Sequence, residues 1–205
     1  MATEAVETHE AEHAEGHHDV HQLRKTAMWV FLGSECVFFG AMISTFLLYR
    51  NTTADGPSAS EIFDIPFTSA SSFVLLMSSL TMVLAHNAFE KNDMRTTRIW
   101  LLGTAFLGSS FLAGQIFEFT EFLHHDPPLT IGTSPFGSAF YMLTGFHGAH
   151  VAVGILLLMA MAILSLSGRL HHDRGLNVEL VGLYWHFVDI VWIIIFTVVY
   201  LLQVG

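Results

Sequence analysis

The stretch Ala139–Ser167 reads AFYMLTGFHGAHVAVGILLLMAMAILSLS and contains no Lys, Arg, Asp or Glu. A helix of this length, at about 1.5 Å per residue, is long enough to cross the ~30 Å hydrocarbon core of a bilayer. Its apolar residues are continuous rather than alternating, and an open sheet cannot satisfy its backbone in lipid. The stretch therefore predicts a transmembrane helix.

Four further stretches of the 205-residue chain have the same character. They cover about 27–49, 67–89, 99–123 and 178–203. Only 13% of all residues are charged, against about 25% in a soluble domain, and proline and glycine are frequent in the connections. The sequence predicts an all-α fold, with one domain of five transmembrane helices over residues 23–205 and a polar tail over residues 1–22.

The Lys and Arg residues are distributed unevenly between the two sides of the predicted bundle. Only Arg50 falls on one side. The other side carries Arg24, Lys25, Lys91, Arg95, Arg98, Arg169 and Arg174. Because the side rich in basic residues is normally cytoplasmic, the N-terminus is predicted inside and the C-terminus outside.

The tail, residues 1–22, is rich in His and Glu and is predicted to be a disordered, solvated arm. His9, His13, His17 and His21 are spaced by four residues and would form one stripe on a helix. Such a stripe could bind zinc or copper, but Gly16 interrupts it. The tail lacks the apolar core of a signal peptide. Separately, the chain has no basic patch with interleaved aromatics, so nucleic-acid binding is not expected.

Polar residues within the predicted spans are candidates for function, because a charge at mid-bilayer costs at least ~2.5 kcal/mol. Depth counting along the helices separates them into two layers. The inner layer contains Glu35, His186 and Asp189. The outer layer contains Gln115, Glu118, His147 and His150.

Three interpretations of these layers are open from spacing alone. Histidines and carboxylates can bind a metal or haem. They can instead form interhelical hydrogen bonds, with carboxylates partly protonated, or they can handle protons. The fourth span also carries two small-residue pairs that allow close helix approach, Gly145 with Ala149 and Gly148 with Ala152.

Several motifs resemble those of subunit III of the haem–copper oxidases. The segment GSAFYMLTGFHGAHV at 137–151 and the segment YWHFVDIVW at 184–192 are similar to its two long signatures. The segment SECVFF at 34–39, and the helix from Thr68 to His86, are similar to two further family helices. The resemblance covers residues 22–203 and leaves the tail outside.

The resemblance implies a role in a terminal oxidase that reduces oxygen to water and pumps protons. In this family subunit III holds no haem, copper or substrate, which belong to subunits I and II. The matched polar residues are then structural, while Glu35 corresponds to the family's intramembrane carboxylate. Subunit III stabilises subunit I, supports proton uptake and protects against inactivation during turnover.

The resemblance also implies partners and a location. Subunit I is the expected main contact, with subunit II and a small subunit IV as further partners, in a bacterial cytoplasmic membrane. Mitochondrial-type members have seven helices and hold phospholipids in a cleft between the first two helices and the other five. This chain is similar to the five-helix bacterial form, so phospholipid stays only an open candidate ligand.

Two alternatives and one question stay open. Similar proteins accompany some nitric oxide reductases, and a free-standing membrane metalloprotein or proton carrier would also use buried Glu and His. The electron donor, cytochrome c or quinol, is not readable from this chain.

Overall fold

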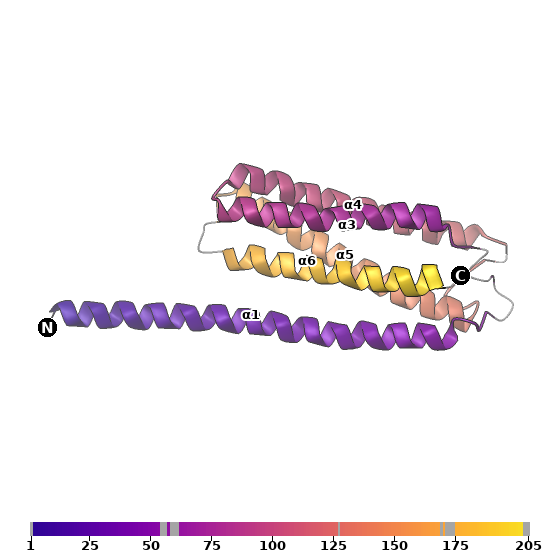
Figure 1. Ribbon diagram of the computed structural model, residues 1–205, viewed down its shortest axis with the longest axis horizontal. Helices are drawn as coiled ribbons and strands as arrows, with labels where there is room; N and C mark the ends of the chain where they lie inside the picture. Colours follow the sequence, from indigo (N-terminus) through magenta and orange to yellow (C-terminus); the bar gives the residue numbers. More distant parts are fainter. Residues whose placement is uncertain are drawn as a thin grey trace. The chain divides into compact units, whose positions relative to one another are not determined.

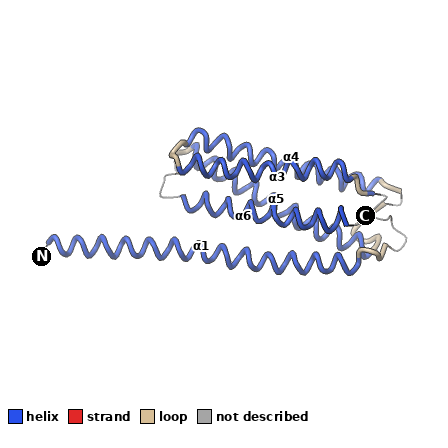
Figure 2. Tube along the Cα trace, in the orientation of Figure 1, coloured by secondary structure: helices blue, strands red, loops and turns tan. Residues whose placement is uncertain are grey.

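The computed structural model describes residues 2–53, 57, 62–126, 128–168, 170 and 175–202, with side chains from residue 20 onward. Long helices make up nearly all of it (Figures 1 and 2). They are α1 (Ala2–Tyr49), α3 (Ile65–Glu90), α4 (Met94–His124), α5 (Pro135–Leu166) and α6 (Gly175–Phe196), which continues into the π-helix η2 (Thr197–Leu201). No strand occurs among the described residues.

Each of the five helices contains a stretch long and apolar enough to cross a membrane. The prediction of an all-α protein with five transmembrane helices is therefore confirmed at the level of length and composition. We treat the chain below as a multi-pass membrane protein.

Three helices begin a few residues before the apolar stretches do, because a polar side chain caps each start. The carboxylates of Asp64 and Asp93 each accept a backbone N–H at 3.1 Å, from Phe67 and Thr96 respectively. The hydroxyl of Ser134 accepts the N–H of Gly137 at 3.0 Å. Such caps satisfy N–H groups that have no partner within the helix.

The turn between α3 and α4 is tight. Asn92 has φ of 58°, a left-handed conformation that asparagine tolerates better than most residues. Its N–H donates to the carbonyl of Phe89 at 2.9 Å, and the N–H of Asp93 donates to the carbonyl of Ala88 at 3.0 Å. The Thr96 hydroxyl, bonded to the Asp93 carboxylate at 2.6 Å, holds the pKa of Asp93 below its usual value.

The chain falls into two compact units, Met1–Val37 and Phe38–Gly205. The first unit is the N-terminal part of α1, which includes residues 2–22 within a helix. The side chains of His9, His13 and His17 lie outside the described ones, so the disorder and metal binding of the tail stay predictions.

The core of the second unit is a ring of four helices. Helix α3 packs against α4 and α6, and α5 packs against the same two (Figure 1). Large aromatic side chains fill the middle of the ring, and Trp185 and Trp192 of α6 are both almost fully buried. Polar residues that face this core must find partners inside it.

Candidate functional site

Glu118 joins three helices in the core of the second unit. One carboxylate oxygen, Oε1, accepts a hydrogen bond from the Thr68 hydroxyl of α3 at 2.9 Å. The other, Oε2, accepts one from the Tyr200 hydroxyl of η2 at 3.2 Å. The Glu118 side chain is only 5% exposed, so these two donors decide how it is satisfied.

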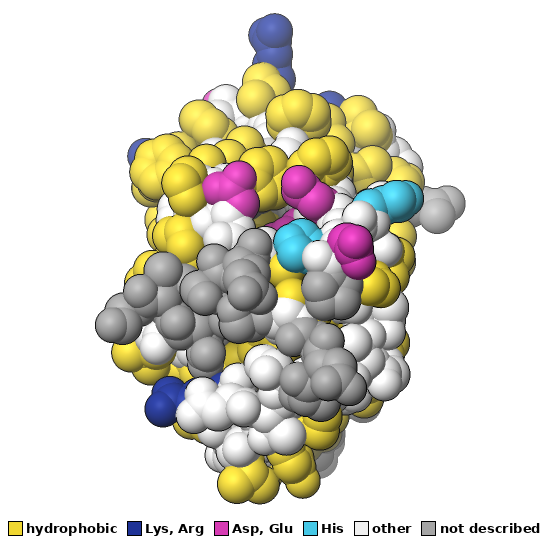
Figure 3. Space-filling view, turned by 90° about the vertical axis from the view of Figure 1, so that its right-hand side faces the viewer, with side chains coloured by type: hydrophobic (Ala, Val, Ile, Leu, Met, Phe, Trp, Pro, Cys, Tyr) yellow, Lys and Arg dark blue, Asp and Glu magenta, His cyan; other side chains and the backbone are white. Residues whose placement is uncertain are grey.

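The end of the second unit near this carboxylate is rich in titratable side chains. It carries the start of α3 and the end of α4, and Figure 3 shows acidic and histidine side chains gathered on it. Asp64 and Glu121 both lie close enough to Glu118 to interact with it electrostatically. Glu118 is therefore the buried member of an acidic group.

Gln115 connects α4 to α5 one turn away from Glu118. Its amide nitrogen Nε2 donates to the carbonyl of Thr144 at 2.7 Å. The amide oxygen lies beside Gly148, where a Cβ atom would stand only 2.8 Å from it. Glycine at 148 thus makes room for this contact, in the manner expected for a small residue at a helix interface.

His147 lies among aromatic rings and has a 0% exposed side chain. Its ring stacks on Trp192 with centroids 4.9 Å apart and meets the edge of Phe111 at 6.0 Å. Neither ring nitrogen has a hydrogen-bond partner within the described part of the chain. His150, one turn on, places Nδ1 2.7 Å from the Phe146 carbonyl and packs against the ring of Phe39.

The predicted outer layer is thus four residues with four different sets of neighbours. Glu118 bonds to α3 and η2, and Gln115 bonds to α5. His147 packs against α6, and His150 packs against the last part of α1. Glu118 and Gln115 meet the neighbouring helices through hydrogen bonds, whereas His147 and His150 meet them through ring contacts. Among the described residues, no group of three or more His, Cys, Asp or Glu is arranged to hold a metal ion.

Two members of the predicted inner layer share a neighbour on α3. The hydroxyl of Ser79 lies 2.6 Å from Nδ1 of His186 and also interacts with the carboxyl of Asp189. Asp189 is 4% exposed, and its Oδ1 has no hydrogen-bond partner in the described residues. Glu35 belongs to the first unit, so its expected proximity to His186 stays a prediction.

Hydroxyl groups of α3 are the partners that depth counting missed. Ser72 accepts the indole N–H of Trp192 at 2.9 Å, and Ser78 accepts that of Trp185 at 3.1 Å. Together with Thr68 and Ser79 they line one helix that has no charged residue between 65 and 89. The many serines and threonines in this apolar span are the sequence signal that could have identified α3 as the source of these hydrogen-bond partners.

The small residues of α5 do not all serve the same contact. Gly154 and, on α4, Gly108 both lie against the six-membered ring of Trp185. Gly148 faces Gln115, whereas a Cβ at Gly145 would meet no described atom within 4 Å. The remaining predicted packing residues, Ala149 and Ala152, are exposed and half-buried respectively.

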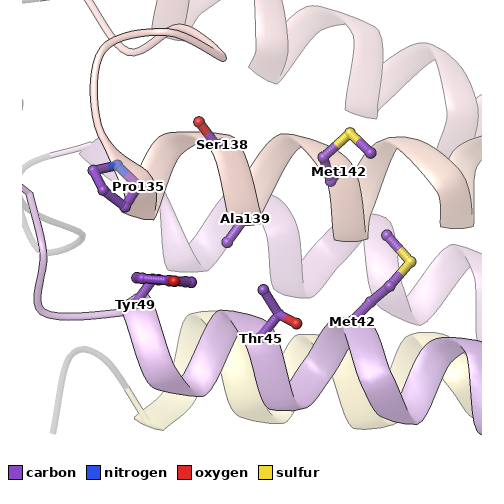
Figure 4. A pocket seen from close by; sticks show the side chains of 7 residues that line it. All are labelled: Met42, Thr45, Tyr49, Pro135, Ser138, Ala139 and Met142. Carbon is purple, nitrogen blue, oxygen red and sulfur yellow. The ribbon is translucent and has the colours of Figure 1, made fainter.

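A groove lies between the last turns of α1 and the first turns of α5, within the second unit. Its volume is about 380 Å³, and Figure 4 shows the side chains that line it. They are Met42, Thr45, Tyr49, Pro135, Ser138, Ala139 and Met142. The lining is apolar with three hydroxyls and no charged group.

A family model described as cytochrome c oxidase subunit III matches residues 7–204. The chain belongs to this family. The matched region includes all five transmembrane helices, so membership of the subunit III family covers the whole membrane domain.

Curated members of the subunit III family are similar over most of their length. Cytochrome c oxidase subunit 3 of Bacillus sp. strain PS3 is 41% identical over 174 residues, which cover 85% of this chain and 83% of that protein. Quinol oxidase subunit 3 of Bacillus spizizenii is 36% identical over 184 residues, covering 90% and 89%. Cytochrome c oxidase subunit 3 of Synechocystis is 35% identical over 204 residues, covering 98% and 85%.

The two long motifs that resemble the family signatures lie where α5 and α6 pack against the other helices. In this subunit III chain, the segment 184–192 supplies Trp185 and Trp192 to the centre of the helix ring, and His186 and Asp189 to the contact with α3. The segment 137–151 supplies Gly148 and His147, which face α4 and α6. Both signatures describe how α5 and α6 pack.

Proposed function

We propose that this chain is the non-catalytic subunit III of a bacterial haem–copper terminal oxidase. Its function is to stabilise subunit I and to support proton uptake during the reduction of oxygen to water. Haem and copper stay in the partner subunits. Family membership over the membrane domain carries this proposal, and the engagement of Glu118, Gln115 and His186 in interhelical contacts supports a structural role for this chain.

Copurification tests the proposed function. A tagged chain, extracted from its native membrane in mild detergent, is expected to bring down haem-containing subunits at a one-to-one ratio. The preparation is expected to consume oxygen and not nitric oxide. A chain that purifies alone, or that retains metal after separation from all partners, would contradict the proposal and favour the free-standing metalloprotein.

The electron donor is tested on the same preparation. The relatives include subunits named for cytochrome c oxidases and for quinol oxidases, so both donors are offered to the complex in turn.

Subunit I is the proposed main contact, with subunit II and a small subunit IV next to it. Chemical crosslinking of the intact complex identifies which of them touch this chain.

The proposed orientation places the N-terminus in the cytoplasm and the C-terminus outside. The seven basic residues on one side against Arg50 on the other support it. Alkaline phosphatase fused after Gly205 is expected to be active, because this enzyme needs the oxidising outer compartment. The same enzyme inserted at Asn92, in the α3–α4 turn, is expected to be inactive. The opposite pattern would reverse the topology.

Phospholipid is the ligand proposed for the surface of this chain. The groove between α1 and α5 is lined by apolar side chains and hydroxyls, without a charge. That chemistry suits a hydrocarbon chain entering from the surrounding bilayer better than it suits a metal ion.

A further inference from the structure

Three buried polar atoms of the interface between α4 and α5 have no hydrogen-bond partner in the described part of the chain. They are Oε1 of Gln115 and both ring nitrogens of His147. Gln115 is 6% exposed and His147 is fully buried, so both side chains are enclosed by this subunit itself. Buried polar groups nearly always have a partner, either in the protein or in ordered water.

The two side chains belong to the same layer of the core. The Gln115 amide lies against two residues of α5. Its Nε2 donates to the Thr144 carbonyl at 2.7 Å, and its Oε1 lies 2.8 Å from the place that a Cβ of Gly148 would take. His147 precedes Gly148 in the chain, and its ring packs against Phe111, which is one turn before Gln115 on α4. The amide oxygen and the imidazole therefore lie at one level of the interface.

The surroundings of His147 leave little choice of occupant. Its ring stacks on Trp192 at 4.9 Å between ring centroids, and the indole N–H of Trp192 already donates to Ser72. A partner subunit or a lipid headgroup would have to displace a helix to reach a side chain that is fully buried. The described residues also include no group of three or more His, Cys, Asp or Glu that is arranged to hold a metal ion. Water is small enough for a packed core and can both donate and accept.

We propose that an ordered water molecule binds between α4 and α5, where it joins Oε1 of Gln115 to a ring nitrogen of His147. The water donates one hydrogen to the amide oxygen, which can only accept. It meets the imidazole as donor or as acceptor, since a neutral histidine has one N–H and one bare nitrogen. The site lies wholly within this chain, so it goes beyond the proposed function and does not depend on it.

The water extends the contacts of Gln115 from one helix to two. Gln115 bonds directly to α5, and the water fixes the orientation of the His147 ring, which stacks on Trp192 of α6. A water-mediated hydrogen bond is nearly as favourable in enthalpy as a direct one. The pair His147 and Gly148 thus serves one site, because Gly148 makes room for the amide and His147 supplies the second partner of the water.

Radiolytic footprinting tests the water site on the protein purified from its native membrane, with any subunits that accompany it. A short X-ray pulse splits water into hydroxyl radicals, which modify the nearest side chains. A buried residue is therefore oxidised when an ordered water lies beside it. Trp192 is compared with Trp185 of the same helix, because both indoles are almost fully buried and both donate their N–H to a serine of α3.

Trp192 is expected to be oxidised at least about threefold faster than Trp185, because Trp192 stacks on the histidine that holds the proposed water. Peptide mass spectrometry measures both rates in the same sample. Equal rates for the two tryptophans, fast or slow, would overturn the water site.

Removal of the polar partners tests the assignment of the water to these residues. His147→Phe keeps a planar ring against Trp192 but has no nitrogen, and it is expected to lower the oxidation rate of Trp192 to that of Trp185. If this variant does not fold, Gln115→Met replaces it, since methionine keeps the length of the side chain without the amide. His150→Phe makes the same change one turn away and is expected to leave the rate unaltered.

The result against the assignment is equally specific. Fast oxidation of Trp192 that persists in a folded His147→Phe protein would show that His147 does not hold the water. Loss of fast oxidation in His150→Phe as well would place the water elsewhere, and would also overturn the site between Gln115 and His147.

Discussion

Alanine at Gly108 or Gly154 is expected to destabilise the helix ring by about 1–3 kcal/mol in each case, the usual cost of overpacking a core. A Cβ at Gly108 would overlap the six-membered ring of Trp185, and one at Gly154 would stand 2.8 Å from the Cε3 and Cζ3 atoms of that ring. Trp185 cannot move aside easily, because its indole N–H donates to Ser78. The ring is therefore in close contact with α4 and α5 and is fixed at its polar atom by a hydrogen bond.

Two glycines on the same helices provide matched controls. Gly103 of α4 and Gly145 of α5 would place a Cβ in open space, with no described atom within 4 Å. Alanine at these positions is expected to be neutral or to stabilise the helix by up to about 1 kcal/mol. The measurement is the free energy of unfolding in mixed detergent micelles, with the loss of helix monitored by far-UV circular dichroism. Equal changes in the free energy of unfolding at all four positions would show that the close contacts of Gly108 and Gly154 with Trp185 do not decide the stability.

The five helices were predictable from the sequence because length and apolarity are properties of single segments. The stretch 139–167 needs no partner to be recognised as a span, and its length alone excludes most alternatives. The helix starts were less predictable. Asp93 and Ser134 are polar and weaken an apolar average, yet they are the residues that cap α4 and α5.

The grouping of the buried polar residues was predictable only by depth. Depth counting placed Gln115, Glu118 and His147 at one level, but the rotation of each helix about its axis decides which neighbour a side chain meets. Gln115 and Glu118 are three residues apart on α4, yet one bonds to α5 and the other to α3 and η2. A single sequence fixes depth through residue counting, whereas helix rotation depends on the packing of all four helices.

Replacing Glu118 with leucine is expected to destabilise subunit III by about 1–3 kcal/mol, mainly through one orphaned hydroxyl. Thr68 can turn to a second acceptor, since its Oγ1 already lies 3.0 Å from the Asp64 carbonyl. Tyr200 is 1% exposed and has its hydroxyl bonded to Glu118 alone among the contacts found in the described residues. Its lost hydrogen bond therefore has no replacement.

A double-mutant cycle isolates this contribution. Tyr200→Phe removes the hydroxyl, so Glu118→Leu made in that background is expected to cost at least about 1 kcal/mol less than in the wild type. Glu121→Leu, on an exposed position of the same helix, is the control and is expected to change stability by less than about 0.5 kcal/mol.

Additive effects of the two changes would mean that the Tyr200 hydroxyl does not depend on Glu118, and that Glu118 matters through volume alone. A favourable coupling has a further consequence for the fold. Tyr200 stands in the π-helix η2, and a π-turn shifts the register of the side chains that follow it. If the coupling is confirmed, the hydrogen bond between Tyr200 and Glu118 stabilises the side-chain register that points Tyr200 at the buried carboxylate. This hydrogen bond is then a physical reason for α6 to end in a π-helix.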